Sequence, residues 1–298
     1  MSEPSFGSGP SFGAGPVAAG AVCPTHPERA SIATCSRCGR FLCADCRLQE
    51  SPPTCAACLS RQRDALGIGT QGMTVGSTLS LAFRLMRATA PVLVAVVGIG
   101  AALGIALELF VPELPRSATN LVDRVYELTV GIVLNTAVVA AMMNASEGVT
   151  LSPGAALQEG LNAWGRVLKY RFLSGLLILL FTLLLVVPGV LKALSYAFVT
   201  ILAWKNVPDP LEESTRVTAG RRGPLFLVMF VAFLIFCVVF GVPTVTMAVL
   251  AENLPALRIP SAVVGGVSIN IAERILDASV VAAYLLLTNE LTLNRRAA

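Results

Sequence analysis

Seven of the eight cysteines and the single histidine of this chain lie between residues 23 and 58. They form four pairs in which two residues separate the partners: Cys23/His26, Cys35/Cys38, Cys43/Cys46 and Cys55/Cys58. Zinc prefers thiolate sulfur and imidazole nitrogen, and four such ligands complete a tetrahedral site. Eight ligands therefore predict two structural zinc ions, with no coordination position left for a catalytic water.

A disulfide framework is the alternative use of such a cluster. The odd number of thiols, with a histidine in the eighth place, argues against it. A cytoplasmic location would also keep the thiols reduced. A module of roughly 40 residues can hardly fold on its own core, so metal binding would supply most of its folding free energy.

The stretch CPTHPERASIATCSRCGRFLCADC, followed by CAAC, resembles a B-box-type zinc finger over residues 23–58. B-boxes usually end in two histidines, whereas this chain has Cys55 and Cys58, which are also good zinc ligands. The resemblance implies a cross-brace and a role in binding a protein partner. The first site would take Cys23, His26, Cys43 and Cys46, and the second Cys35, Cys38, Cys55 and Cys58. Spacing alone leaves a sequential pairing open.

The remainder of the 298-residue chain is strongly apolar. Hydrophobic residues make up 55% of the sequence and charged residues 13%, against roughly 25% charged residues in a typical soluble domain. The excess apolar surface must face lipid rather than a larger core. The net charge of +4 is too small to indicate a nucleic-acid partner.

Six mostly apolar segments approach the length that a membrane span needs. They are Ala90–Phe110, Tyr126–Asn144, Phe172–Val187, Val190–Trp204, Pro224–Leu250 and Leu276–Leu291. We expect the third and fourth to form a tight hairpin around Pro188 and Gly189. We also expect the fifth to kink at Gly241–Pro243.

Basic residues predict the orientation, because cytoplasmic segments carry an excess of Lys and Arg. With the N-terminus inside, the inner segments hold most of them, including Arg84, Arg166, Lys205, Arg221 and Arg222. The outer loops hold Arg116, Arg124, Lys192, Arg258 and Arg274. The zinc module and both termini are therefore expected in the cytoplasm. No basic segment with an apolar run precedes Cys23, so we expect no secretory signal.

Three segments that combine basic residues with periodic apolar ones each precede a span: Thr78–Leu93, Ala155–Phe172 and Pro210–Phe226. We expect cytoplasmic amphipathic helices that lie on the bilayer surface, the first through Leu81 and Leu85. Six spans would then form three hairpins.

Residues 74–292 resemble the multi-span membrane domain fused to some bacterial glycerophosphodiester phosphodiesterases. The resemblance is carried by Val187-Pro188-Gly189-Val190 and AFVTILAWKNVPDPLEESTRVTAGRRGPLF. Pro210, Ser214, Val217 and Gly220 occupy its motif positions, and Pro210 and Val217 depart from the usual residues. The phosphodiesterase's histidine chemistry is not expected here, because His26 is the only histidine.

Ionisable residues inside a membrane often mark transport pathways. We expect the charged residues near span ends to reach the interface instead: Glu108, Glu127, Lys192, Asp277 and Glu290. Asn135 and Asn270 would form hydrogen bonds between helices. Gly100 and Gly104 allow close helix packing, within the fold or between copies of a homo-oligomer.

Together these patterns predict a small two-zinc cross-brace finger followed by an all-α polytopic membrane domain. The expected parts are a disordered Gly/Ser/Pro/Phe tail (1–20), a B-box-like finger (21–62), a linker (63–73) and an α-helical membrane domain (74–294). We expect a non-enzymatic protein of the bacterial inner membrane that contacts the bilayer and, through the finger, a protein partner. A transporter or channel with a regulatory finger is the alternative, and a membrane-embedded enzyme is a third hypothesis. A charge inside the membrane, away from span ends, would favour transport.

Overall fold

The computed structural model describes residues 20–50, 53–68, 72–110, 122, 124–254 and 258–297. Apart from residue 20, the predicted Gly/Ser/Pro/Phe tail lies outside these residues. The chain divides into two compact units. The first holds the chain up to Ala65 with Glu147–Val149, and the second holds Leu66–Ser146 and the chain from Thr150 onward.

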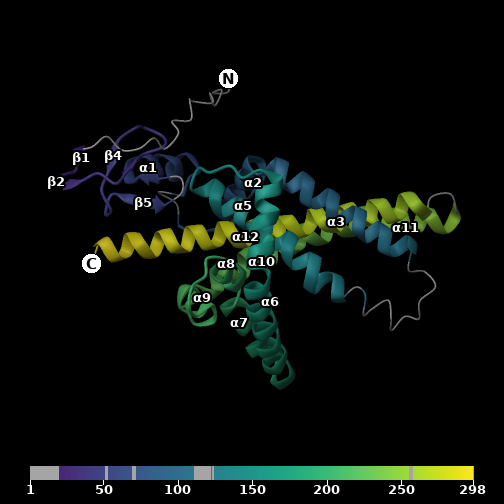
Figure 1. The fold of residues 1–298 in the computed structure, drawn as a ribbon. Coiled ribbons are helices and arrows are strands. Elements are labelled where there is room, and N and C mark those ends of the chain that lie inside the picture. Colours follow the sequence, from purple (N-terminus) through teal and green to yellow (C-terminus); the bar gives the residue numbers. More distant parts are fainter. Residues whose placement is uncertain are drawn as a thin grey trace. The chain divides into compact units, whose positions relative to one another are not determined.

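The first unit combines short hairpins with one helix (Figure 1). Three antiparallel two-stranded sheets pair β1 with β2, β3 with β4, and β5 with β6. Its elements are β1 (Val22–Cys23), β2 (His26–Ala30), β3 (Ala33–Thr34), β4 (Phe41–Leu42), β5 (Arg47–Glu50), β6 (Pro53–Cys55) and α1 (Ala56–Ala65). Among its described residues, Leu42 packs with Cys35, Cys55 and Cys58 in a core too small to fold this unit alone.

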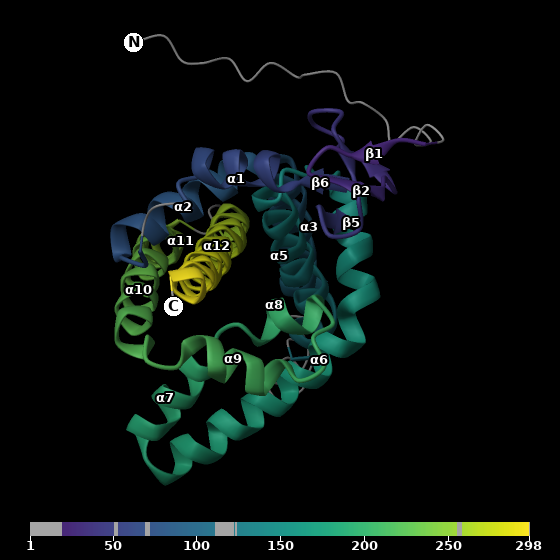
Figure 2. The ribbon, with the colours of Figure 1, turned by 90° about the vertical axis from the view of Figure 1, so that its left-hand side faces the viewer.

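The second unit is helical. Its N-terminal half contains α2 (Val75–Ala88), α3 (Ala90–Phe110), the π-helix η1 (Glu127–Gly131), α5 (Ile132–Ser146) and α6 (Pro153–Leu184). Its C-terminal half contains α7 (Val186–Ser195), α8 (Val199–Trp204), α9 (Pro210–Thr218), α10 (Arg222–Phe236), the π-helix η2 (Cys237–Gly241), α11 (Val242–Asn253) and α12 (Arg258–Ala297). The 40-residue α12 packs against α2, α3, α5, α10 and α11, and Figure 2 shows it nearly end-on among its neighbours.

Five helical segments are long and apolar enough to cross a membrane: Ala90–Leu107, Arg124–Ser146, Pro153–Leu184, Val186–Trp204 and Arg222–Ala251. These segments correspond to the first five predicted spans and indicate a membrane protein. The sixth predicted span lies within α12, which is not among the five, so the count of six stays a prediction. The π-helix η2 ends at Gly241, the first residue of the expected kink at Gly241–Pro243, so the helix type changes there.

The third and fourth predicted spans differ from the structure. The expected interfacial helix Ala155–Phe172 and the third span are one continuous helix, α6. The chain turns at the extended residue Leu185, not at Pro188-Gly189, which lie in the first turn of α7, where proline is tolerated. Gly189 faces Thr182 at a distance that leaves no room for a Cβ atom, so it permits the close approach of α7 to α6.

The position of Lys192 in the α6–α7 hairpin conflicts with the predicted orientation. Lys192 and Arg222 line one cavity, although the six-span scheme puts them on opposite faces of the membrane. Residues that share a small cavity cannot be separated by a hydrocarbon core of about 30 Å. The α6–α7 hairpin therefore does not place Lys192 across the bilayer from Arg222.

The apolar face of α2 is covered by protein. Leu81 and Leu85 are fully buried in the core of the helical unit, where α12, α10 and α5 pack against α2. The apolar face of the expected surface helix therefore packs on protein, while Phe83, Arg84 and Arg87 on other faces of α2 are exposed. Periodic leucines predict that one face of a helix is apolar, but they do not tell whether lipid or protein covers it.

Ser214 in α9 forms hydrogen bonds to both sides of the break between α7 and α8. Its hydroxyl donates to the carbonyl of Ser195 at 2.7 Å and accepts from the backbone N–H of Phe198 at 3.2 Å. Both groups are buried and would otherwise lack a partner at the helix break. The serine of the predicted membrane-domain motif thus has a structural role in this chain.

Candidate metal centre

Two groups of four ligand atoms converge in the first unit, and they contain all eight predicted ligands. Within each group every ligand atom lies within 4.8 Å of the others. The groups interleave along the sequence, which is the pairing that the B-box resemblance implies. They are Cys23, His26, Cys43 and Cys46, and Cys35, Cys38, Cys55 and Cys58.

The first group joins two turns. Cys23 ends β1 and His26 begins β2, while Cys43 and Cys46 flank the turn between β4 and β5. The Nδ1 atom of His26 lies 3.4 Å from the Sγ of Cys43 and 3.2 Å from the Sγ of Cys46. The Sγ atoms of Cys23 and Cys46 are 3.7 Å apart. The histidine nitrogen and these sulfurs therefore point to a common centre.

The second group joins the β3–β4 turn to the start of α1. Cys35 and Cys38 lie in that turn, Cys55 ends β6, and Cys58 lies in the first turn of α1. The Sγ atoms of Cys38 and Cys55 are 3.7 Å apart. Backbone N–H groups support two sulfurs: Cys55 donates to the Sγ of Cys35, and Cys58 donates to the Sγ of Cys55, both at 3.4 Å.

These separations fit the edges of a zinc tetrahedron. Zn–S bonds of about 2.3 Å and Zn–N bonds of about 2.0 Å give S–S edges near ~3.8 Å and S–N edges near ~3.5 Å. The observed 3.7 Å and 3.2–3.4 Å match both. A disulfide would bring two sulfurs to about 2.05 Å, and every cysteine of the cluster is a free thiol. The group of three cysteines with one histidine and the group of four cysteines could each hold one metal ion.

The turn between Cys35 and Cys38 depends on the glycine that follows it. The N–H of Gly39 donates to the carbonyl of Cys35 at 2.9 Å, and the N–H of Cys35 donates to the carbonyl of Arg40 at 2.8 Å. Gly39 has a φ of 70°, in the left-handed region that glycine adopts without strain. This residue therefore helps to hold both sulfurs on one side of the turn.

The metal-free pKa values divide the thiols into two kinds. Burial opposes ionisation of Cys23 and Cys35, but backbone N–H donors outweigh it and lower the pKa of both thiols to about 6. Burial and neighbouring thiols raise the pKa of Cys46 to about 11 and that of Cys58 to about 12. Burial also raises the pKa of Cys38 in the second group. Each group thus has one thiol that ionises readily and at least one that stays protonated until a metal ion displaces its proton.

A polar cluster in the helical unit contains the hydrogen bond between helices that we expected of Asn135, together with an ion pair that we did not predict. The side-chain amide of Asn135 in α5 donates to Asp277 in α12 at 2.5 Å. The Nη1 atom of Arg274 lies 2.8 Å from the Oδ2 of Asp277, and their side chains are only 5% and 17% exposed. Asp277 lies near the middle of the 40-residue α12, and its expected place at the membrane interface stays a prediction. The signal was the i,i+3 spacing of Arg274 and Asp277, which places both on one helix face.

Comparison of the chain with protein-family models, with curated proteins and with solved structures gives no match. The two resemblances therefore rest on the quoted residues alone. The geometry of the ligand groups stands independently of them, because it follows from distances within this chain.

Proposed function

We propose that this chain is a non-enzymatic membrane adaptor, in which a two-zinc, B-box-like finger recruits a protein partner to a membrane-embedded helical unit. The grouping of the eight ligands into two closed sets of four carries the proposal. A closed site has no open coordination position, so the metal can hold a shape but cannot activate water. The finger would then act through its surface.

That surface offers two exposed aliphatic side chains beside the first site. Val22 in β1 is 49% exposed, and Ile32, which follows β2, is 51% exposed. The nearby Arg29 forms ion pairs with Glu28 and Asp45. Apolar residues within a charged rim are common at protein–protein contacts, so Val22 and Ile32 are the proposed contact residues.

Co-purification of the full chain from its membrane with a crosslinked partner tests the adaptor role. The double variant V22S/I32S should keep two zinc ions and lose the partner. Cys43→Ser should lose both one zinc ion and the partner. An exposed control on α6, Lys169→Gln, should change neither. The adaptor proposal fails if the same partners are captured when Val22 and Ile32 are replaced and when Cys43 is replaced.

A second candidate, ion transport, is favoured by the polar cluster around Asp277. The Nη1 atom of Arg274 and the Oδ2 of Asp277 are close but lack hydrogen-bond geometry, and the Nε of Arg274 is also unbonded. These buried atoms could therefore form hydrogen bonds with another ligand. Proton uptake by proteoliposomes under a potassium gradient tests this candidate. Transport predicts uptake that Asp277→Asn abolishes, and no uptake above that of empty liposomes would exclude proton transport.

A further inference from the structure

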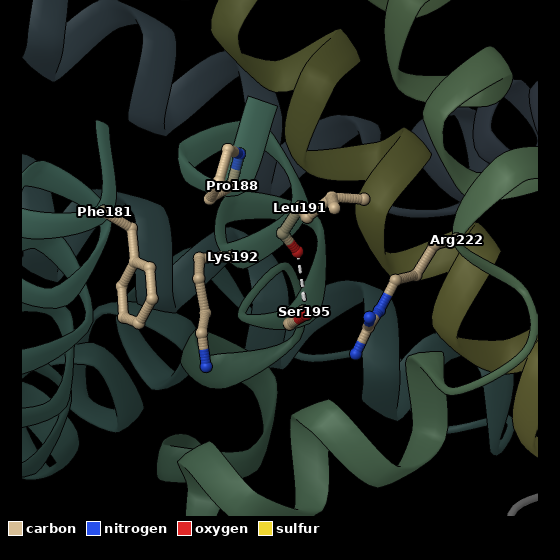
Figure 3. Close-up of a pocket in the computed structure, with 6 residues that line it drawn as sticks. All are labelled: Phe181, Pro188, Leu191, Lys192, Ser195 and Arg222. Carbon is tan, nitrogen blue, oxygen red and sulfur yellow. Dashed lines mark hydrogen bonds between the residues drawn. The ribbon is translucent and has the colours of Figure 1, made fainter. Parts of the chain in front are cut away.

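A cavity of about 220 Å³ lies between α6, α7 and α10 of the helical unit. Figure 3 shows the cations of Lys192 and Arg222 at the two sides of this cavity, with the hydroxyl of Ser195 between them. Apolar side chains from α6 and α7 complete the lining. The lining residues are Phe181, Pro188, Leu191, Lys192, Ser195 and Arg222.

Both cations lack an acidic partner in the described part of the chain. The ammonium of Lys192 lies over two aromatic rings, 4.9 Å from the centre of Phe181 and 5.5 Å from that of Tyr196. The Nε of Arg222 is buried and has no hydrogen-bond partner. Two positive groups on one partly apolar cavity repel each other and lose hydration, so a bound anion would stabilise both.

The shape of the donors indicates which anion fits. A guanidinium presents parallel N–H groups that match two oxygens of a phosphate, while an ammonium acts as a compact point charge. Ser195 adds a hydroxyl at the same cavity, although that hydroxyl now donates to the carbonyl of Leu191 at 2.8 Å. A tetrahedral phosphate group could therefore meet Arg222 on one side and Lys192 on the other.

The position of Arg222 in the sequence indicates the depth of the cavity. Arg222 opens α10 and the apolar segment Arg222–Ala251, so it marks the boundary between water and the membrane at this end. Lys192 shares the cavity and must lie near the same boundary. About seven residues separate Lys192 from the turn at Leu185, roughly 10 Å of helix, so the hairpin tip would enter only part of a ~30 Å core.

Apolar side chains surround this boundary on both elements. On the α6–α7 hairpin, Leu183 is 77% exposed and Val187 is 69% exposed, and on α10 Phe226 is 47% exposed. These exposed groups are suited to contact acyl chains, while the cavity lies where phosphate headgroups lie.

We propose that the cavity between α6, α7 and α10 binds the phosphate group of an anionic amphiphile, as in the headgroup of an anionic phospholipid, through Lys192 and Arg222. The site goes beyond the adaptor role and requires no residue of the finger. It gives the helical unit a preference for anionic lipid that a purely apolar surface would lack.

Binding of lipid by the full chain in neutral detergent tests the proposal, with phosphatidylglycerol and phosphatidylcholine offered in equal amounts and retained lipid measured by native mass spectrometry. The wild type should retain phosphatidylglycerol preferentially. K192Q/R222Q should reduce this preference at least about tenfold, because each charge-assisted hydrogen bond contributes that much. The charge-matched control K169Q/R221Q removes two cations, one on α6 and one directly before α10, that do not line the cavity, and it should keep the preference.

Two further arms complete the test. Inorganic phosphate identifies the source of the anion: saturable binding that K192Q/R222Q abolishes, without lipid preference, would support the same site with free phosphate as its ligand. The charge-preserving variant K192R/R222K should keep binding and shows whether a folded unit with altered side chains still recognises the anion. The proposal is overturned if the wild type binds neither anion, or if K169Q/R221Q and K192Q/R222Q lose binding equally.

Discussion

The finger and the helical unit differ in what determines their structure. In the finger, four local pairs of ligands converge on two points, and these contacts replace a hydrophobic core. In the helical unit, a large apolar core sets the fold, and the polar groups that matter come from distant parts of the sequence, such as Asn135 and Asp277. Metal chemistry therefore organises the first unit from short-range spacing, whereas packing organises the second from long-range contacts.

Metal removal should separate the two units most strongly. A chelator should unfold the finger, because structural zinc supplies about 10–16 kcal/mol of apparent binding free energy in small modules. The helical unit should keep its helices, since its core contains no metal ligand among the described residues. Limited proteolysis with circular dichroism in detergent checks this, with cleavage expected within residues 20–65 and an intact helical fragment. Loss of the helical signal on chelation would contradict the independence of the two units.

Within the helical unit, breaking the buried ion pair should have the next largest effect. Asp277→Ala leaves the buried Arg274 with only Glu273, 2.7 Å away, as an ionic partner among the described residues. We expect a loss of about 3 kcal/mol in the free energy of unfolding, the lower part of the range for broken buried pairs. Glu273→Gln, at a side chain 47% exposed, should cost less than about 1 kcal/mol. Denaturant unfolding in detergent measures the free energy of unfolding of both variants. Equal losses for Asp277→Ala and Glu273→Gln would contradict the burial of the Arg274–Asp277 pair.

The helix break between α7 and α8 gives a smaller, local prediction. Ser214→Ala leaves the Ser195 carbonyl and the Phe198 N–H buried without this partner, and should cost about 1–3 kcal/mol. Ser279→Ala removes an equally buried hydroxyl whose partner, among the described residues, is the Ile275 carbonyl of its own helix, so its cost should be well below that of Ser214→Ala. The same unfolding experiment compares the two variants. Similar costs would indicate that Ser214 does not hold the break.

The pH dependence of zinc affinity gives a gradual effect confined to the finger. At pH 7 the raised pKa values of Cys46, about 11, and Cys58, about 12, keep both thiols protonated without metal, while the low pKa of Cys23 and Cys35, about 6, leaves them ionised. Zinc must displace the bound protons, so affinity should rise with pH by about tenfold per unit for each proton released.

The stability of the zinc-bound finger changes with pH in the same direction as its zinc affinity. The unfolded thiols, with a pKa of 9.0, hold more protons than the zinc-bound finger at neutral pH, so the stability of the zinc-bound finger should rise up to about pH 9. Calorimetry in buffers of different ionisation enthalpy counts the released protons at pH 7. Zinc binding without any proton release would contradict the assignment of Cys46 and Cys58 as ligands.

The sequence predicted the parts of the structure that depend on neighbouring residues. The C-x-x-H and C-x-x-C pairs identify the eight residues of the two groups, because each pair lies on one turn. Long apolar runs likewise predicted six spans, and five of them correspond to helical segments of membrane length. These features need no knowledge of which elements pack together.

The predictions that failed concern features that depend on which elements pack together. Leu81 and Leu85 have the spacing of an interfacial helix, yet protein covers them, because lipid and a protein core are both apolar. Lys192 and Arg222 are thirty positions apart and share one cavity, which no local pattern shows. The sharing of one cavity by two distant cations therefore could not be predicted from their places in the apolar runs.

The zinc content of the purified full chain decides whether the eight ligands form two metal sites. Metal analysis should give two zinc ions per chain for the wild type, one for Cys35→Ser, and two for Cys237→Ser, whose exposed thiol lies in η2, outside both groups. Zero or one zinc ion in the wild type would contradict the assignment of eight ligands to two closed sites.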